Sequence, residues 1–208
     1  MNKQRLAEFG LLACALFWGM SGLLSQVAMD QVTPFNLTFF RFLIAGVISI
    51  TVFRVNPFKM DKNTIIHAFK LSILLFIIYI SSTYGLKYTS ASNASFIIGS
   101  TVFLVPILNL IVFKVGISKK EALCVVTSFI GLGLVTLKGA KALNIGDLLC
   151  LVDAFAYSSY MIYNSRLKND TNPLEVASIQ FLFVAFYSFI YVLIFESLVH
   201  PPDTATHD

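Results

Sequence analysis

Two ionisable side chains lie inside long apolar stretches of this sequence and are the first candidates for chemistry. Arg41 belongs to TPFNLTFFRFLIAG, and Asp153 belongs to LLCLVDAFAYSSY. An arginine keeps its positive charge in proteins and attracts anionic groups, whereas a carboxyl group can take up or release a proton. Arg41 is therefore a candidate substrate-binding residue, and Asp153 is a candidate proton carrier or cation site.

Both residues also have a purely structural interpretation. Arg41 can extend toward lipid headgroups or hydrogen-bond to a neighbouring helix. Asp153 can be protonated and bonded to a nearby hydroxyl group. The residues alone leave these alternatives open, although an ionisable group inside an apolar span is a functional hypothesis by default.

Aromatic and polar side chains recur along one face of two expected helices. Spacings of three, four and seven residues place side chains on the same helical face. The residues concerned are Trp18, Ser21, Ser25 and Gln26 in one helix, and Tyr157, Tyr160 and Asn164 in another. Such faces line a passage or mediate ordinary helix packing. The predicted aromatic walls of a substrate site are Trp18, Tyr84, Tyr157 and Tyr160.

The composition shows what surrounds these residues. Of the 208 residues, 57% are hydrophobic and only 12% are charged, and the mean hydropathy is +0.79. A soluble domain carries about 25% charged residues. The chain is therefore expected to be a polytopic membrane protein whose first partner is the lipid bilayer. Its net charge of +4 then concerns topology, since no basic surface with interleaved aromatics suggests nucleic acid. The three cysteines lack metal-ligand spacing, and we expect no metal and no cofactor.

Seven segments are long and apolar enough to cross a bilayer as helices, which needs about 20 residues each. The fold class predicted is thus all-α, a polytopic transmembrane helix bundle of about seven spans. The spans are roughly 8–29, 33–53, 64–85, 91–113, 121–138, 146–165 and 174–195.

Basic residues outside the spans set the orientation, because cytoplasmic loops carry an excess of Lys and Arg. With the N-terminus inside, the outer ends hold only Lys87, Lys138 and Lys141. The cytoplasmic ends hold Lys3, Arg5, Arg54, Lys59, Lys62, Lys114, Lys119, Lys120, Arg166 and Lys168. We therefore expect a multi-pass protein of the cell (plasma) membrane with a cytoplasmic N-terminus.

The fourth span has two features that affect its packing. Ala91, Ser95 and Gly99 recur four residues apart, which allows a neighbouring backbone to approach closely. Pro106 removes one backbone hydrogen bond from the middle of the helix. We expect the helix to bend at this proline.

Several segments together resemble the EamA-type branch of the drug/metabolite transporter superfamily. The segments are FWGMSGLLSQ, PFNLTFFRFLIAG, YTSASNASFIIGSTVFLVPIL, IGLGLVTLK and GDLLCLVDAFAYSSYMIYNSRL. They cover most of residues 8–195. Each segment alone is a weak signal, whereas the combination is specific.

The resemblance implies two five-helix repeats of opposite orientation. We expect a first repeat over 6–138, an incomplete second repeat of two helices over 146–195 and a polar tail over 196–208. A shift of 139 residues pairs Trp18 with Tyr157, Pro34 with Pro173, Arg41 with Gln180, Phe42 with Phe181 and Leu43 with Leu182. Members of this branch typically have ten helices, so the seven-span chain is expected to be a truncated product or a fragment.

The resemblance also implies a function, which is transport of small metabolites such as amino-acid-like, amine or drug-like solutes. It implies outward transport by alternating access, with Trp18 and Arg41 at the substrate site. Asp153 is assigned from position alone, because the family usually has an apolar residue there. The alternative is a non-transporting remnant or a membrane interaction subunit, and a homo- or hetero-oligomer stays open.

An intramembrane enzyme is not expected. A serine nucleophile such as Ser21 needs a base within hydrogen-bond reach. His67 lies at a helix end and His200 and His207 lie in the tail, so none is at the depth of Ser21. A channel is disfavoured because no ring of carboxylates or filter-like carbonyl motif is apparent.

Overall fold

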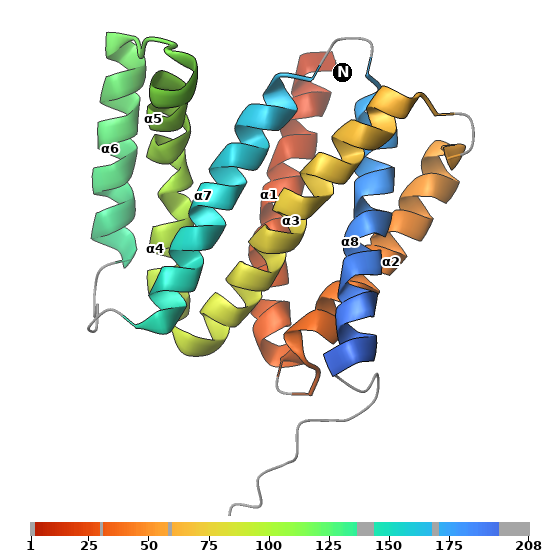
Figure 1. The fold of residues 1–208 in the computed structure, drawn as a ribbon. Helices are drawn as coiled ribbons and strands as arrows, with labels where there is room; N and C mark the ends of the chain where they lie inside the picture. The colour runs from red at the N-terminus through yellow and green to blue at the C-terminus, as the bar shows by residue number, and fades with distance from the viewer. Residues whose placement is uncertain (1–2, 30, 58–59, 137–143, 168–170, 196–208) are drawn as a thin grey trace, which may run out of the picture.

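A computed structural model describes residues 3–29, 31–57, 60–136, 144–167 and 171–195. These residues form α-helices and, over the described ranges, no strand. The helices, labelled as in Figure 1, are α1 (Lys3–Ala28), α2 (Pro34–Phe53), α3 (Lys62–Tyr88), α4 (Ala91–Gly99), α5 (Thr101–Phe113), α6 (Lys119–Thr136), α7 (Ile145–Ser165) and α8 (Pro173–Phe195). The all-α prediction is confirmed.

The pair α3 and α7 forms the centre of the bundle. Helix α8 packs against α3 and along α2, which lies at one edge, while α4 and α5 pack against α7 on the other side. Helix α6 packs mainly against α4 and α5 and forms the opposite edge of the bundle (Figure 1). The main core cluster joins α2, α3, α7 and α8 through Phe42, Leu75, Ile78, Ala156, Val184 and Ala185.

Five helical segments of the described chain are long and apolar enough to span a membrane. They are Pro34–Phe53, Lys62–Tyr88, Ala91–Phe113, Ile145–Ser165 and Pro173–Ile194. Helix α1 contributes a shorter apolar segment, Glu8–Gly22. Each of the seven predicted spans nevertheless coincides with a helix or, for 91–113, with α4 and α5 together, which agrees with a polytopic bundle.

The fourth span is interrupted at Ser100, and the bend expected at Pro106 stays a prediction. Helix α4 ends at Gly99 and α5 begins at Thr101, whereas Pro106 lies inside α5. The Thr101 hydroxyl donates to the carbonyl oxygen of Ile98 at 2.7 Å. This bond competes with the backbone bond that would continue the helix, so a hydroxyl side chain rather than the proline accompanies the interruption.

Close backbone approach holds α3 and α7 together near one end. A Cβ added at Gly146 would lie 2.7 Å from the Thr89 nitrogen and 2.8 Å from the Gly85 carbonyl oxygen. Only a glycine hydrogen fits there. The same end of α7 carries a capping box between Asn144 and Asp147, and Thr89 donates a hydrogen bond to the Asp147 carboxylate. The two helices therefore meet in a fixed register.

Hydroxyl side chains are common inside the bundle. Ser158 and Ser178 are fully buried, and each donates to the carbonyl four residues earlier in its own helix. Ser178 also bonds Ser49 across α2 and α8 at 2.6 Å. Small hydroxyl residues let helices approach closely without leaving polar groups unpaired, as is usual in membrane bundles.

Candidate functional site

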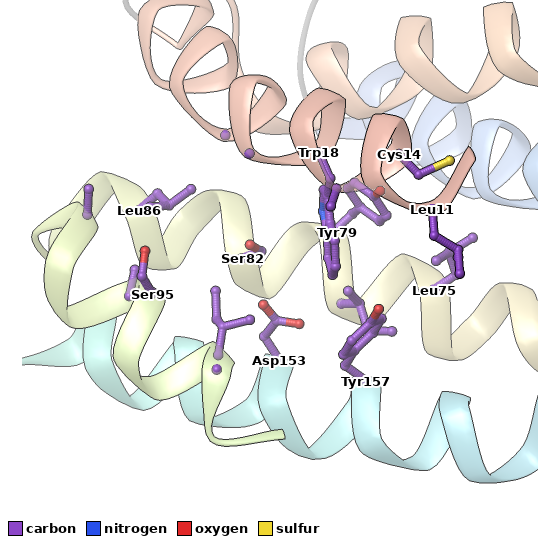
Figure 2. A pocket seen from close by; sticks show the side chains of 18 residues that line it. Leu11, Cys14, Trp18, Leu75, Tyr79, Ser82, Leu86, Ser95, Asp153 and Tyr157 are labelled. Carbon is purple, nitrogen blue, oxygen red and sulfur yellow. The ribbon is translucent and has the colours of Figure 1, made fainter. Parts of the chain in front are cut away.

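A cavity of about 870 Å³ lies between α1, α3, α4 and α7 (Figure 2). Sites for small molecules typically occupy roughly 300–1,000 Å³, so this volume suits a small solute. Its walls are mostly apolar or small side chains. The lining residues are Leu11, Cys14, Ala15, Trp18, Gly19, Gly22, Leu75, Ile78, Tyr79, Ser82, Leu86, Ala91, Ala94, Ser95, Ile98, Gly99, Asp153 and Tyr157.

Among the described residues that line the cavity, Asp153 is the one with a formal charge. It is 2% exposed, and Figure 2 shows it on α7 facing Ser82 on α3. The Ser82 hydroxyl group is a polar neighbour of the Asp153 carboxyl group. Its Oδ1 atom has no hydrogen-bond partner among the described residues. A buried carboxylate oxygen without a partner is costly, so this group is suited to receive a proton or a cation.

Aromatic rings form one end of the cavity. Trp18 of α1 and Tyr157 of α7 pack with ring centroids 5.6 Å apart and planes at 54°. Tyr79 adds a third ring from α3, as Figure 2 shows. Trp18 remains 56% exposed, since α1 covers the bundle loosely. The predicted wall residues Trp18 and Tyr157 thus lie together with Asp153 around one space.

Arg41 does not line the cavity and lies behind its wall. Its guanidinium donates to the hydroxyl groups of Ser21 and Ser25 on α1, the latter at 3.4 Å. The guanidinium carbon also lies 4.9 Å from the centre of the Tyr79 ring. Arg41 therefore joins α2 to α1 and α3, which is the neighbouring-helix interaction considered from the sequence. The polar face of α1 is used here for packing.

Two other predicted wall residues point elsewhere. Tyr84 packs its ring edge against Phe35 of α2 with centroids 5.9 Å apart. Tyr160 exchanges hydrogen bonds with Gln180 of α8 at 3.1 and 3.3 Å. Its ring lies parallel to that of Tyr157 at 6.5 Å, so it supports the cavity wall from behind.

Tyr79 and Ser82 line the cavity but are not among the site residues predicted from the sequence. Together with Leu86 they are spaced at i, i+3 and i+7, the spacing of one helical face. Ala91, Ser95 and Gly99 were recognised as a stripe but interpreted as a packing surface. All three line the cavity, where small side chains leave space for a solute.

The described residues contain no group of three His, Cys, Asp or Glu side chains placed to hold a metal ion. Ser21 contacts the Arg41 guanidinium, which is no general base. His67 lies near Tyr163, with 2.7 Å between Nδ1 and the phenol oxygen. Nothing in these contacts activates a serine nucleophile.

Residues 5–137 match the EamA-like transporter family. The chain belongs to this family. An uncharacterized transporter of Archaeoglobus fulgidus is 32% identical over 175 residues, which cover 84% of this chain and 54% of that protein. The uncharacterized transporter YyaM of Bacillus subtilis is 28% identical over 204 residues, or 90% of this chain and 64% of its own length.

A third relative is named for the compounds that it transports. The S-adenosylmethionine/S-adenosylhomocysteine transporter of Chlamydia muridarum is 28% identical over 101 residues, 47% of this EamA-like chain and 32% of that protein. The chain spans about half to two thirds of the length of the first relatives named above. No solved structure matches it significantly.

Proposed function

We propose that this EamA-like chain binds small metabolites in the cavity between α1, α3, α4 and α7 and exports them by alternating access. The observation that carries the proposal is the buried Asp153 carboxyl group, with one oxygen unpartnered among the described residues, on the wall of an 870 Å³ space. The relatives named as transporters support the class of function. The bilayer is the cell membrane, with the N-terminus on the cytoplasmic side.

The proposed roles follow from position in the cavity. Trp18 and Tyr157 form aromatic walls that hold the body of the solute. Asp153 carries the coupling proton, because it lines the cavity and has a free acceptor oxygen. Arg41, Tyr84 and Tyr160 lie outside the cavity in this conformation, and their contact with a solute stays a prediction.

The packing of α2 against α8 supports alternating access between inverted repeats. A two-fold axis in the membrane plane brings residues near it into contact with their own equivalents in the other repeat. Phe42 and Phe181, which a shift of 139 residues pairs, pack with ring centroids 5.6 Å apart. Leu182, which the same shift pairs with Leu43, also lies close to α2, because a Cβ added at Gly46 would lie 2.7 Å from its side chain. The two-repeat organisation itself stays a prediction that these contacts favour.

Helix α1 is the wall best suited to move. Its large apolar residues are mostly exposed within the bundle, for example Phe17 at 73%. Its main polar ties to the rest of the bundle are the bonds from Arg41 to Ser21 and Ser25. A helix held by so few contacts can open one side of the cavity while α3 and α7 stay packed.

The test is transport by the purified chain in proteoliposomes. Trp18→Ala and Arg41→Ala should abolish accumulation of radiolabelled amines or amino acids in variants that still fold. Phe17→Ala is the matched control, because Phe17 neighbours Trp18 on α1 but does not line the cavity. The Phe17→Ala variant should accumulate the labelled solutes at the same rate as the unaltered chain. Absence of transport by the unaltered chain would favour the alternative of a non-transporting remnant or interaction subunit.

A further inference from the structure

We infer that the cavity selects solutes with a single positive charge and an apolar or aromatic body over anionic and zwitterionic ones. This inference concerns the same cavity and rests on the proposed function. It assigns a substrate class from the charges that line the space.

The negative charge available to a solute is that of Asp153. Its Oδ1 atom has no hydrogen-bond partner among the described residues. A carboxylate in an apolar space gains more from an ion pair than one in water, because the surrounding dielectric is low. An ammonium or other monocation therefore finds a binding partner that no neutral solute can use as well.

The described lining of the cavity offers no positive charge to a carboxylate of the solute. None of the described residues that line it is Lys, Arg or His. The other titratable groups that line it are Cys14 from α1, Tyr79 from α3 and Tyr157 from α7. Arg41 already donates to two hydroxyls and lies against Tyr79. An anion or the carboxylate of a zwitterion would be desolvated there without a counter-charge.

The rings around the space favour the same charge. Trp18, Tyr79 and Tyr157 line the cavity, and the faces of aromatic rings attract cations. Small residues on α4, among them Ala91 and Ser95, leave room beside them for an apolar group. The combined site thus fits an amine whose charge meets Asp153 and whose body lies among the rings.

The experiment uses Trp18, which is the single tryptophan of the sequence, as a reporter of cavity occupancy. The full chain in detergent is titrated with 2-phenylethylamine, phenylalanine and 3-phenylpropanoate while the tryptophan emission is recorded. These probes share a phenyl ring and are a cation, a zwitterion and an anion at neutral pH. The expected result is a saturable change with 2-phenylethylamine at concentrations at least tenfold below those for the other two.

Asp153→Asn should weaken binding of 2-phenylethylamine at least tenfold and abolish the preference over phenylalanine. Glu121→Gln is the matched control, because it removes the same charge from an exposed position outside the cavity. It should bind the amine as the unaltered chain does. If Asp153→Asn does not fold, the order of affinities of the three probes for the unaltered chain still tests the inference.

The inference would be overturned if phenylalanine or 3-phenylpropanoate bound as tightly as 2-phenylethylamine or more tightly. It would also be overturned if no probe changed the tryptophan emission. Binding in detergent requires no transport, so the two proposals fail separately. Amine binding without flux in proteoliposomes would refute export and leave the selectivity intact. Flux of phenylalanine with no preference for the amine would refute the selectivity and leave transport intact.

Discussion

The contact at Gly146 predicts a large effect from adding one methyl group. In Gly146→Ala the new Cβ would lie 2.7–2.8 Å from backbone atoms of Gly85, Tyr88 and Thr89. No side chain can rotate away, so α3 and α7 must separate by several tenths of an ångström. Overpacking of this kind costs about 1–3 kcal/mol. For a chain of this length, that corresponds to a fall of roughly 2–12 °C in melting temperature.

The assay is thermal unfolding of the purified variant in detergent, followed by size-exclusion chromatography of the soluble fraction. Gly131→Ala is the matched control, since an added Cβ there meets nothing within 4 Å. It gains the helix preference of alanine, about 0.8–1 kcal/mol, without the clash. A melting temperature for Gly146→Ala equal to or above that of Gly131→Ala would refute the close approach of α3 and α7.

Three further substitutions test other parts of the molecule. Arg41→Lys should loosen α1 and shift the Trp18 emission, because lysine is shorter and lacks the two separate nitrogens that bond Ser21 and Ser25, and each bond to a charged group contributes about 1.5–3 kcal/mol. An unchanged emission spectrum would contradict this. Lys114→Gly should raise the melting temperature, since Lys114 has a left-handed φ of 55° that costs a non-glycine residue about 1–2 kcal/mol. A lower melting temperature than that of the unaltered chain would contradict this backbone strain. Asp153→Asn should flatten the pH dependence of transport, because it removes the proposed proton carrier. A pH profile like that of the unaltered chain would contradict the proton role.

The sequence was enough to predict the helices, whereas the site residues stay predictions. Trp18, Tyr157 and Asp153 each stood out as aromatic or ionisable groups in apolar segments, and the structure places all three around one cavity. That Trp18 and Tyr157 face each other follows from how α1 and α7 are arranged, which spacing within a helix does not reveal.

Which of the predicted residues line the cavity depends on tertiary packing. Tyr84 lies two positions after Ser82, about 200° around α3, and so points to α2 when Ser82 points to the cavity. The helical period shows that Ser82 and Tyr84 lie on different faces of α3. It does not show which of the two faces borders the cavity. The stripe at Ala91, Ser95 and Gly99 had the same ambiguity, because small residues serve both close packing and open space.

The most direct test of the central claim is whether water and solute reach the cavity inside the membrane. Cys14 lines the cavity and is exposed, whereas Cys150 is buried. In a Cys124→Ser background, Cys14 should react with a membrane-impermeant thiosulfonate present on both sides of proteoliposomes, and 2-phenylethylamine should slow the reaction. The control is Leu12→Cys in a Cys14→Ser, Cys124→Ser chain, because position 12 is exposed at similar depth but lies outside the cavity. We predict fast labelling at position 14 and little at position 12; equal rates at both positions, or none at either, would contradict a solute-accessible cavity.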